Sequence, residues 1–445
     1  MTFLKSIILL VALIFSCPFR GTAEKLNVVM IMADDVGYEC FSAYGSKEFS
    51  TPRLDALAAK GIRFDHCHST PLCTPSRVNL MTGKSNVFNY VNFGVFPKGE
   101  PTFANHFQAQ GYATAVAGKW QLLTTQGGIS PEEAGFEHHC VWNIPGTERR
   151  RYWEPSLMHD GKVINHGKEK YGSTIIADYL IDFIKTNKDK PFLAYYPMNL
   201  PHSPFDPTPR SANRKNKNEK HNFIDMVAYM DHCVGRMEDT LIELGLRENT
   251  LIIFTADNGT SSSLTIDFFG TEHKGGKGYT HDHGTKVPLI LNLPGRIKAG
   301  QVNKDLICFS DLFPTIVEAA DLPARKINQG DGWSFWSQCL GKEGKKREWI
   351  YGYYFPRPFS KQFDRKYSHW EVAWARNKLY KLYRDGRFFD VIKDVREEKP
   401  LGNRSELSTI RKSLQAALDK YPDKGGMIDY DRVNGVRKTA KAKKK

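Results

Sequence analysis

Cys73 opens a short stretch, Cys73-Thr-Pro-Ser-Arg77, that continues to Thr82-Gly83. A lone cysteine can be a nucleophile, a metal ligand or a buried thiol, and the last is the commonest. Arg77 follows Cys73 by one helical turn, and the sequence predicts a helix that starts near Ser76. A helix N-terminus together with an arginine favours an anionic group at residue 73. An ordinary surface arginine is the alternative interpretation.

Oxygen side chains follow two apolar runs. Asp34 and Asp35 come after residues 26–33, and Asp257 and Asn258 come after residues 251–256. Such runs are typical of buried parallel strands, whose carboxyl ends gather ligand sites at one sheet edge. Hard oxygen ligands suit calcium or magnesium rather than zinc or copper. The alternative is that these residues only form turns or helix caps.

The elements that must position these residues alternate between strand and helix. Further strands are predicted at 112–117, 191–197 and 287–293, and helices at 52–60, 102–110, 174–184, 222–244 and 310–320. This order predicts an α/β fold with a large, mostly parallel sheet between helices. Residues 128–172 show weak periodicity and are interpreted as an insertion with loops, and residues 259–286 as a glycine- and histidine-rich loop.

The residue pattern of the sequence changes near residue 345. Short aromatic runs there predict a small antiparallel sheet with a final helix near 405–421. The predicted organisation is a signal peptide (1–23), a catalytic domain (24–340), a C-terminal α+β subdomain (341–430) and a basic disordered tail (431–445).

The N-terminus resembles a secretory signal. Lys5 supplies a positive charge, residues 7–15 an apolar run, and Gly21-Thr-Ala23 a small-residue cleavage site. Cleavage at Cys17, as in a lipoprotein, is a less favoured alternative. The apolar run is short for a membrane span, so we expect an exported protein with no stable span.

The 445-residue chain carries a formal charge of +14. Removing residues 1–23 deletes Lys5 and Arg20 and no acid, which leaves +12. A basic body favours anionic partners. Because no nucleic-acid-binding module is recognisable, we expect a polyanionic substrate rather than nucleic acid.

Cysteine content adds a constraint. Of eight cysteines, seven lie beyond the signal peptide, an odd number for an exported protein. If Cys73 is chemically converted, six remain that could pair, although no spacing dictates how.

The chain resembles the type I (formylglycine-dependent) sulfatases of the alkaline phosphatase-like superfamily. Their signature Cys-x-Pro-x-Arg, followed by Thr-Gly, matches Cys73, Pro75, Arg77 and Thr82-Gly83. The resemblance implies that Cys73 is oxidised by a maturation system to formylglycine (3-oxoalanine), whose hydrate attacks sulfur. It covers residues 26 to about 392.

The resemblance also implies roles for other residues. The metal ligands would be Asp34, Asp35, Asp257 and Asn258 together with residue 73, and the ion Ca²⁺, with Mg²⁺ possible. Lys119 of Gly118-Lys-Trp120 and Lys277 of Gly276-Lys-Gly278 would bind sulfate. His202 of Pro201-His-Ser-Pro204 would lie beside the leaving-group oxygen. A cysteine thiolate suits such a hard cation poorly, which agrees independently with conversion of Cys73.

One position departs from the family pattern. Gln121 stands where the family usually has the histidine that helps to expel sulfate, and glutamine cannot accept a proton at useful pH. His281-Asp282-His283 is also unusual, and we favour a loop peculiar to this chain over a relocated acid–base group.

The sequence therefore predicts an exported sulfatase acting on a sulfated carbohydrate, with selectivity in residues 128–172 and 204–221. The alternatives are a phosphonate or phosphate monoester hydrolase of the same superfamily, and a weakly active relative that binds sulfated glycans.

Overall fold

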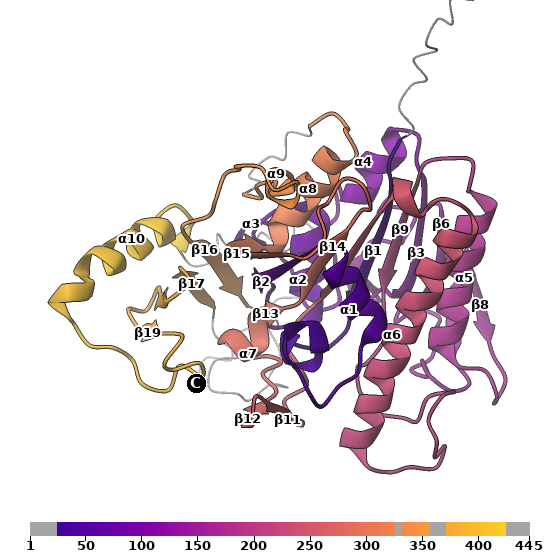
Figure 1. Cartoon of the computed structure of the whole chain (residues 1–445), viewed down its shortest axis with the longest axis horizontal. Coiled ribbons are helices and arrows are strands. Elements are labelled where there is room, and N and C mark those ends of the chain that lie inside the picture. Colours follow the sequence, from indigo (N-terminus) through magenta and orange to yellow (C-terminus); the bar gives the residue numbers. More distant parts are fainter. Residues whose placement is uncertain (1–24, 325–330, 356–370, 424–445) are drawn as a thin grey trace, which may run out of the picture.

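A computed structural model of the chain describes residues 25–324, 331–355 and 371–423 (Figure 1). The predicted signal peptide (1–23) and basic tail (431–445) lie outside these residues. The predicted division between residues 340 and 341 stays a prediction. None of the helices in the described segments combines the length and the hydrophobicity that a membrane crossing needs.

The large sheet has eleven strands in the described part of the chain. Its centre is parallel, in the order β10 (Thr250–Ala256), β1 (Asn27–Ala33), β9 (Phe192–Pro197), β3 (Ala113–Lys119) and β6 (His138–Trp142). These strands are almost entirely buried, as their apolar sequences predict.

Antiparallel strands flank this centre. On one side β14 (Leu289–Asn292) joins β10 to β2 (Ile62–His68), which also pairs with β13 (Lys286–Val287) and, in parallel, with β15 (Gln301–Cys308). On the other side β7 (Ser156–His159) and β8 (Lys162–Asn165) follow β6. Residues 128–172, interpreted as an insertion with loops, thus contain three strands of this sheet as well as loops. The short β6 is buried except for its first residue and all four residues of β8 are exposed, so neither shows the alternation that identifies a half-buried strand.

Helices cover the sheet in two groups (Figure 1). One contains α1 (Pro52–Ala59), α5 (Gly172–Thr186) and α6 (Glu219–Glu243), and α6 contacts both of the others. The other contains α2 (Cys73–Thr82), α4 (Phe103–Ala109) and α8 (Leu312–Ala319). The mostly parallel α/β fold is confirmed.

The predicted C-terminal sheet is also confirmed. It contains β16 (Ile350–Tyr354), β17 (Val372–Arg376), β18 (Tyr380–Tyr383) and β19 (Phe388–Asp390), all antiparallel, with α10 (Ser408–Leu418) packed on it. Leu72, the residue before α2, packs in one apolar cluster with Tyr354, Trp374 and Tyr383 of this sheet. The small sheet thus supports the start of α2.

Two smaller predictions are corrected. The 259–286 loop contains a hairpin, β11 (Thr265–Phe268) with β12 (Thr271–Lys274), and a helical turn, α7 (Asp282–Thr285). α2 starts at Cys73 and not near Ser76, because a proline in the first turn costs no hydrogen bond. All seven described cysteines are free thiols.

Candidate active site

Four neighbouring parallel strands end at the site. Asp257 follows β10, Asp34 follows β1, the turn to His202 follows β9, and Lys119 closes β3. Ala33 pairs with Ala256 in register, which places the acids after β1 and β10 side by side. The carboxyl edge of the sheet thus gathers these groups, as expected for an open α/β sheet.

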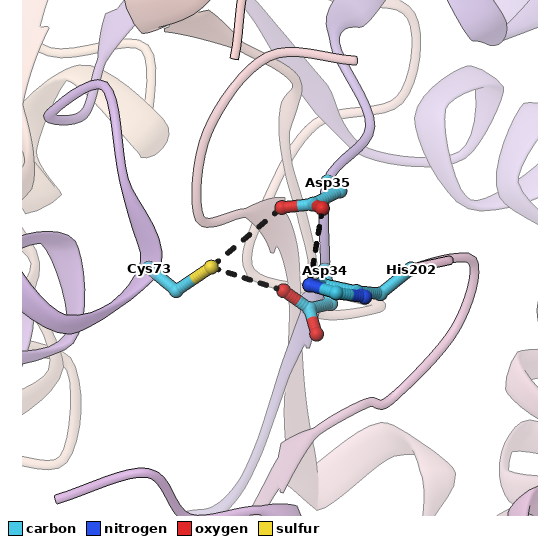
Figure 2. A group of neighbouring side chains, drawn as sticks. All are labelled: Asp34, Asp35, Cys73 and His202. Atoms are coloured by element: carbon cyan, nitrogen blue, oxygen red, sulfur yellow. Dashed lines mark hydrogen bonds and ion pairs between the residues drawn. The ribbon is translucent and has the colours of Figure 1, made fainter. Parts of the chain in front are cut away.

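α2 brings Cys73 and Arg77 to this edge. Both side chains are buried, as is every residue of α2. The Cys73 Sγ atom lies 3.4 Å from Asp34 Oδ1 and 3.6 Å from Asp35 Oδ1 (Figure 2). Burial and the charge of Asp257 raise the pKa of the Cys73 thiol well above its ordinary value.

Arg77 and Lys119 hold the inner carboxylates. Arg77 donates to Asp257 Oδ2 at 3.0 Å and to the Lys119 carbonyl at 2.7 Å. The Lys119 ammonium lies 2.8 Å from the Asp34 carboxylate. Burial opposes ionisation of Asp34, but Lys119 and other neighbouring charges outweigh it and hold the Asp34 pKa below its ordinary value. Burial and the nearby Asp34 raise the pKa of Asp257 to about 7.

Asp35 faces the outer part of the site. Its Oδ2 atom contacts the Lys277 ammonium and lies 3.3 Å from His202 Nε2, as Figure 2 shows for the histidine. Lys277 Nζ is 3.2 Å from the same His202 nitrogen. Burial and the positive charge of Lys277 lower the pKa of His202 to about 4. Asp35 adopts a left-handed backbone (φ 65°), which aspartate tolerates better than most residues.

The donor set fits a hard divalent cation. Ligand atoms of Asp34, Asp35, Cys73 and His202 lie within 4.8 Å of one another. Asn258 Oδ1 is buried without a hydrogen-bond partner among the described residues, so this oxygen is available for an ion, whereas Asp34 Oδ2 lies 2.8 Å from the Lys119 ammonium. Asp257 instead uses both oxygens, for the Asp35 backbone amide at 3.1 Å and for Arg77. The predicted ligands are thus brought together, with His202 beside them.

Glycines allow this close packing. Gly118 has φ 135°, and a Cβ atom there would lie 1.9 Å from the Pro197 carbonyl of β9. A Cβ atom at Gly259 would lie 1.8 Å from the His283 carbonyl. Side chains at these positions would push Lys119 or Asn258 out of place.

The unusual residues lie apart from Cys73. Gln121 is half-buried with φ 53°, and its Oε1 atom has no hydrogen-bond partner among the described residues. His283 contacts the Lys274 carbonyl at 2.9 Å and stacks on His273, and His281 packs against it. Among the described residues, no hydrogen bond links His281 or His283 to Cys73, Asp34 or Asp35.

Sequence reasoning missed two residues at His202. Arg151 Nη2 lies 3.0 Å from His202 Nδ1, and the Tyr152 hydroxyl donates to the His202 carbonyl at 2.5 Å. Both come from the 128–172 region, where weak periodicity gave no signal beyond the run of three arginines at 149–151.

Comparisons with known proteins agree with this picture. The sequence model described as "Sulfatase" matches residues 26–322, and that described as "N-sulphoglucosamine sulphohydrolase, C-terminal" matches residues 272–424. Human arylsulfatase A is 31% identical over 371 residues, covering 75% of this chain and 71% of the relative. The N-acetylglucosamine-6-O-sulfatase of Bacteroides thetaiotaomicron is 24% identical, and the match covers 91% of this chain and 87% of that relative.

A solved structure of a protein in complex with its substrate, D-glucosamine-2-N,6-O-disulfate, superposes with a TM-score of 0.73. It is 22% identical and covers 94% of this chain and all of the other, a likeness that shows the fold. The chain therefore shares the mostly parallel α/β fold of this structure. The matched sequence model and human arylsulfatase A show that the chain belongs to the sulfatase family and is a sulfuric ester hydrolase.

Proposed function

We propose that this protein is an exported sulfatase that hydrolyses sulfate esters of a carbohydrate. In this proposal Cys73 is oxidised to formylglycine, and Asp34, Asp35, Asp257 and Asn258 hold Ca²⁺, or Mg²⁺, beside it. The observation that carries the proposal is the position of Cys73, whose Sγ atom lies 3.4 and 3.6 Å from two buried carboxylates.

The charges of the site support an anionic ester as substrate. Three carboxylates, those of Asp34, Asp35 and Asp257, are accompanied by three cations: Arg77, Lys119 and Lys277. A bound divalent cation supplies additional positive charge, which stabilises the negative charge that gathers on sulfate in the transition state. The site would then be net positive, which favours binding of a sulfate ester.

Each residue has a distinct task in the proposed reaction. Hydrated formylglycine at position 73 supplies an oxygen nucleophile for sulfur. Lys119 and Lys277 bind the sulfate oxygens, and Arg77 keeps Asp257 and the end of β3 in place through its two bonds. His202 Nε2 faces Lys277 and Asp35 and protonates the departing alcohol oxygen.

Substrate class, export and maturation are inferred from other features of the chain. The relative from Bacteroides acts on an N-acetylglucosamine sulfate by its name, and the basic charge of this chain suits a sulfated polysaccharide. Export rests on residues 1–23, and formation of formylglycine requires a maturation system in the host.

Mass spectrometry of the peptide that contains Cys73 tests the modification. We expect a mass lower by the change from CH2SH to CHO, in a host that has a maturation system. Sulfate release from an aryl sulfate should exceed phosphate release from the matching aryl phosphate, and Cys73→Ala should abolish it. Cys339→Ala, at another buried free thiol, is the matched control. Faster cleavage of the phosphate would instead identify a phosphate or phosphonate monoester hydrolase.

A weakly active, glycan-binding relative is the second candidate, and Gln121 favours it. Retention of sulfated glycan without sulfate release, by protein whose Cys73 is shown to be modified, would establish this candidate.

A further inference from the structure

Arg151 is a cation without an acidic partner at the edge of the site. Its side chain is half-buried, and its Nε atom is buried with no hydrogen-bond partner. The guanidinium lies 4.5 Å from the Trp142 ring centroid and 5.4 Å from that of Tyr152. Within the described ranges, no carboxylate lies within 4.0 Å of it. Because a partly desolvated cation is costly without an anion, this arrangement suits a negatively charged ligand.

The surrounding elements fix Arg151 beside the leaving-group side of the site. Trp142, under the guanidinium, pairs in register with Lys119. The Arg151 carbonyl accepts from the Asn199 side chain at 3.1 Å, and the Tyr152 hydroxyl donates to the Asn199 and His202 carbonyls. These hydrogen bonds attach Arg151 and Tyr152 to the turn that carries His202.

Arg151 uses one of its donors on His202. The Nε2 atom of His202 faces Asp35 and Lys277, and with the proton on Nε2 the Nδ1 atom accepts a hydrogen bond from Arg151 Nη2 at 3.0 Å. The remaining guanidinium donors are free to contact a group attached to the leaving alcohol.

A second cation lies on the neighbouring aromatic residue. The exposed Arg214 guanidinium lies 3.8 Å from the Trp153 ring centroid, and Trp153 donates to the Pro207 carbonyl at 2.8 Å. The nearby Asp206 does not neutralise Arg151. Burial raises the pKa of Asp206 although Arg151 and Lys217 oppose this, and the acid stays beyond ion-pair distance.

We propose that Arg151, assisted by Arg214, forms a subsite for a second anionic group on the sugar that carries the scissile sulfate. That group is a carboxylate or a second sulfate, since both match the planar donor array of arginine. The inference rests on the proposed sulfatase function and names a substrate class for the same site: sugars with two negative charges.

Selectivity ratios test the subsite. Steady-state kinetics would compare a monosaccharide with one sulfate, the same sugar with a second sulfate, and the singly sulfated sugar linked to a uronic acid. We expect Arg151→Gln to reduce kcat/KM for one of the dianionic substrates, relative to the singly charged one, at least about tenfold. The loss should lie mainly in KM, and the substrate affected identifies the anion as sulfate or carboxylate.

The adjacent arginine provides the matched control. Arg150 is exposed and pairs with Glu148 and Glu154, so Arg150→Gln should leave the selectivity ratio unchanged. Arg214→Gln should lower the ratio by a smaller factor, about two- to threefold, because that cation is exposed. An unchanged ratio in Arg151→Gln, or an equal fall in kcat for all substrates, would overturn the subsite and leave Arg151 as a residue that only positions His202.

Calorimetric binding in a Cys73→Ser background separates this inference from the proposed function. Cys73→Ser should bind the dianionic sugar, and Cys73→Ser with Arg151→Gln should bind it at least about tenfold more weakly. Equal affinities would refute the subsite. If wild-type protein releases no sulfate from any ester while this difference in affinity persists, the proposed function fails and the subsite stands.

Discussion

Substitution of Asp282 by asparagine should both destabilise the protein and weaken the site. Asp282 forms an ion pair with Arg376 of β17, a side chain that is 1% exposed. Lys286 and Lys381 also act on Asp282, so its removal leaves three cations near one another. Because Asn is nearly the same size as Asp, the change tests charge rather than packing.

The magnitude follows from burial. Removing one partner of a buried ion pair leaves an uncompensated charge and costs about 3–5 kcal/mol, a large share of the stability of a typical protein. Burial alone would raise the pKa of Asp282, but Arg376 and its neighbours hold it below the ordinary value. The pair therefore contributes fully above that ordinary value, and its contribution disappears only as the pH falls through the lowered pKa of the folded state.

The same substitution should affect activity, since Asp282 belongs to the segment that follows Lys277. The C-terminal sheet holds this segment at further points: Tyr354 bonds to the Gly278 carbonyl at 3.3 Å, and Tyr383 and Lys381 bond to Thr280. With Asp282→Asn, the segment loses one of these attachments. We expect a higher KM for sulfate esters at temperatures where the protein is still folded.

Urea denaturation and steady-state kinetics measure the two effects. The double variant Asp282→Asn with Arg376→Met removes both charges, and it should recover at least half of the lost stability. Asp385→Asn is the matched control, because the Asp385–Arg387 pair on the same sheet is partly exposed and worth at most about 1 kcal/mol. Stability within about 0.5 kcal/mol of wild type for Asp282→Asn, or no recovery in the double variant, would refute the reasoning.

Three further predictions concern metal, catalysis and pH. Ca²⁺ in excess should raise the melting temperature of wild type by mass action and should have little effect on Asp35→Asn; equal responses would exclude Asp35 as a ligand. Gln121→His should raise steady-state turnover, by up to about a hundredfold, and shrink any pre-steady-state burst; an unchanged burst would show that residue 121 does not limit sulfate release. Burial lowers the pKa values of His66 and His273 to about 4, so these residues stay neutral in the folded chain but charge near pH 6.5 when unfolded. The contribution of these two histidines should therefore fall as the pH drops from about 6.5 to about 4, so the double variant His66→Gln with His273→Gln should lose less stability over that range than the wild type. Equal losses in urea midpoint for the two proteins would contradict this prediction.

The parts of the fold that sequence could predict are those with a single dominant signal. β1 and β10 are uninterrupted apolar runs that end in acids, and both lie where expected. β2 was not anticipated, because its sequence Ile-Arg-Phe-Asp-His-Cys-His mixes charge with apolar residues and its place depends on β14 and β15. Pairing with strands distant in the sequence stabilises β2, and the periodicity of a single segment does not contain that information.

The same limit applies to the site. Motif residues such as Cys73, Lys119 and His202 could be collected from short local patterns, and the structure brings them together. Arg151 could be placed at the site only from the structure, because its position depends on β6 and on the packing of its guanidinium on Trp142. These two residues are nine positions apart in an irregular segment. No local pattern distinguishes it from Arg150, its solvent-exposed neighbour.

The burial of Cys73 sets a time limit on its proposed oxidation. The residue is 1% exposed and opens a helix with no exposed position, under the support of Leu72 and the C-terminal sheet. A maturation enzyme could not reach this thiol in the folded chain, so it must act before the C-terminal sheet has folded over the start of α2. The rate of Cys73 oxidation then competes with the rate of folding. A cell that folds the chain faster than it oxidises Cys73 would accumulate folded protein that can no longer be modified. The yield of active enzyme would follow the ratio of the oxidation rate to the folding rate.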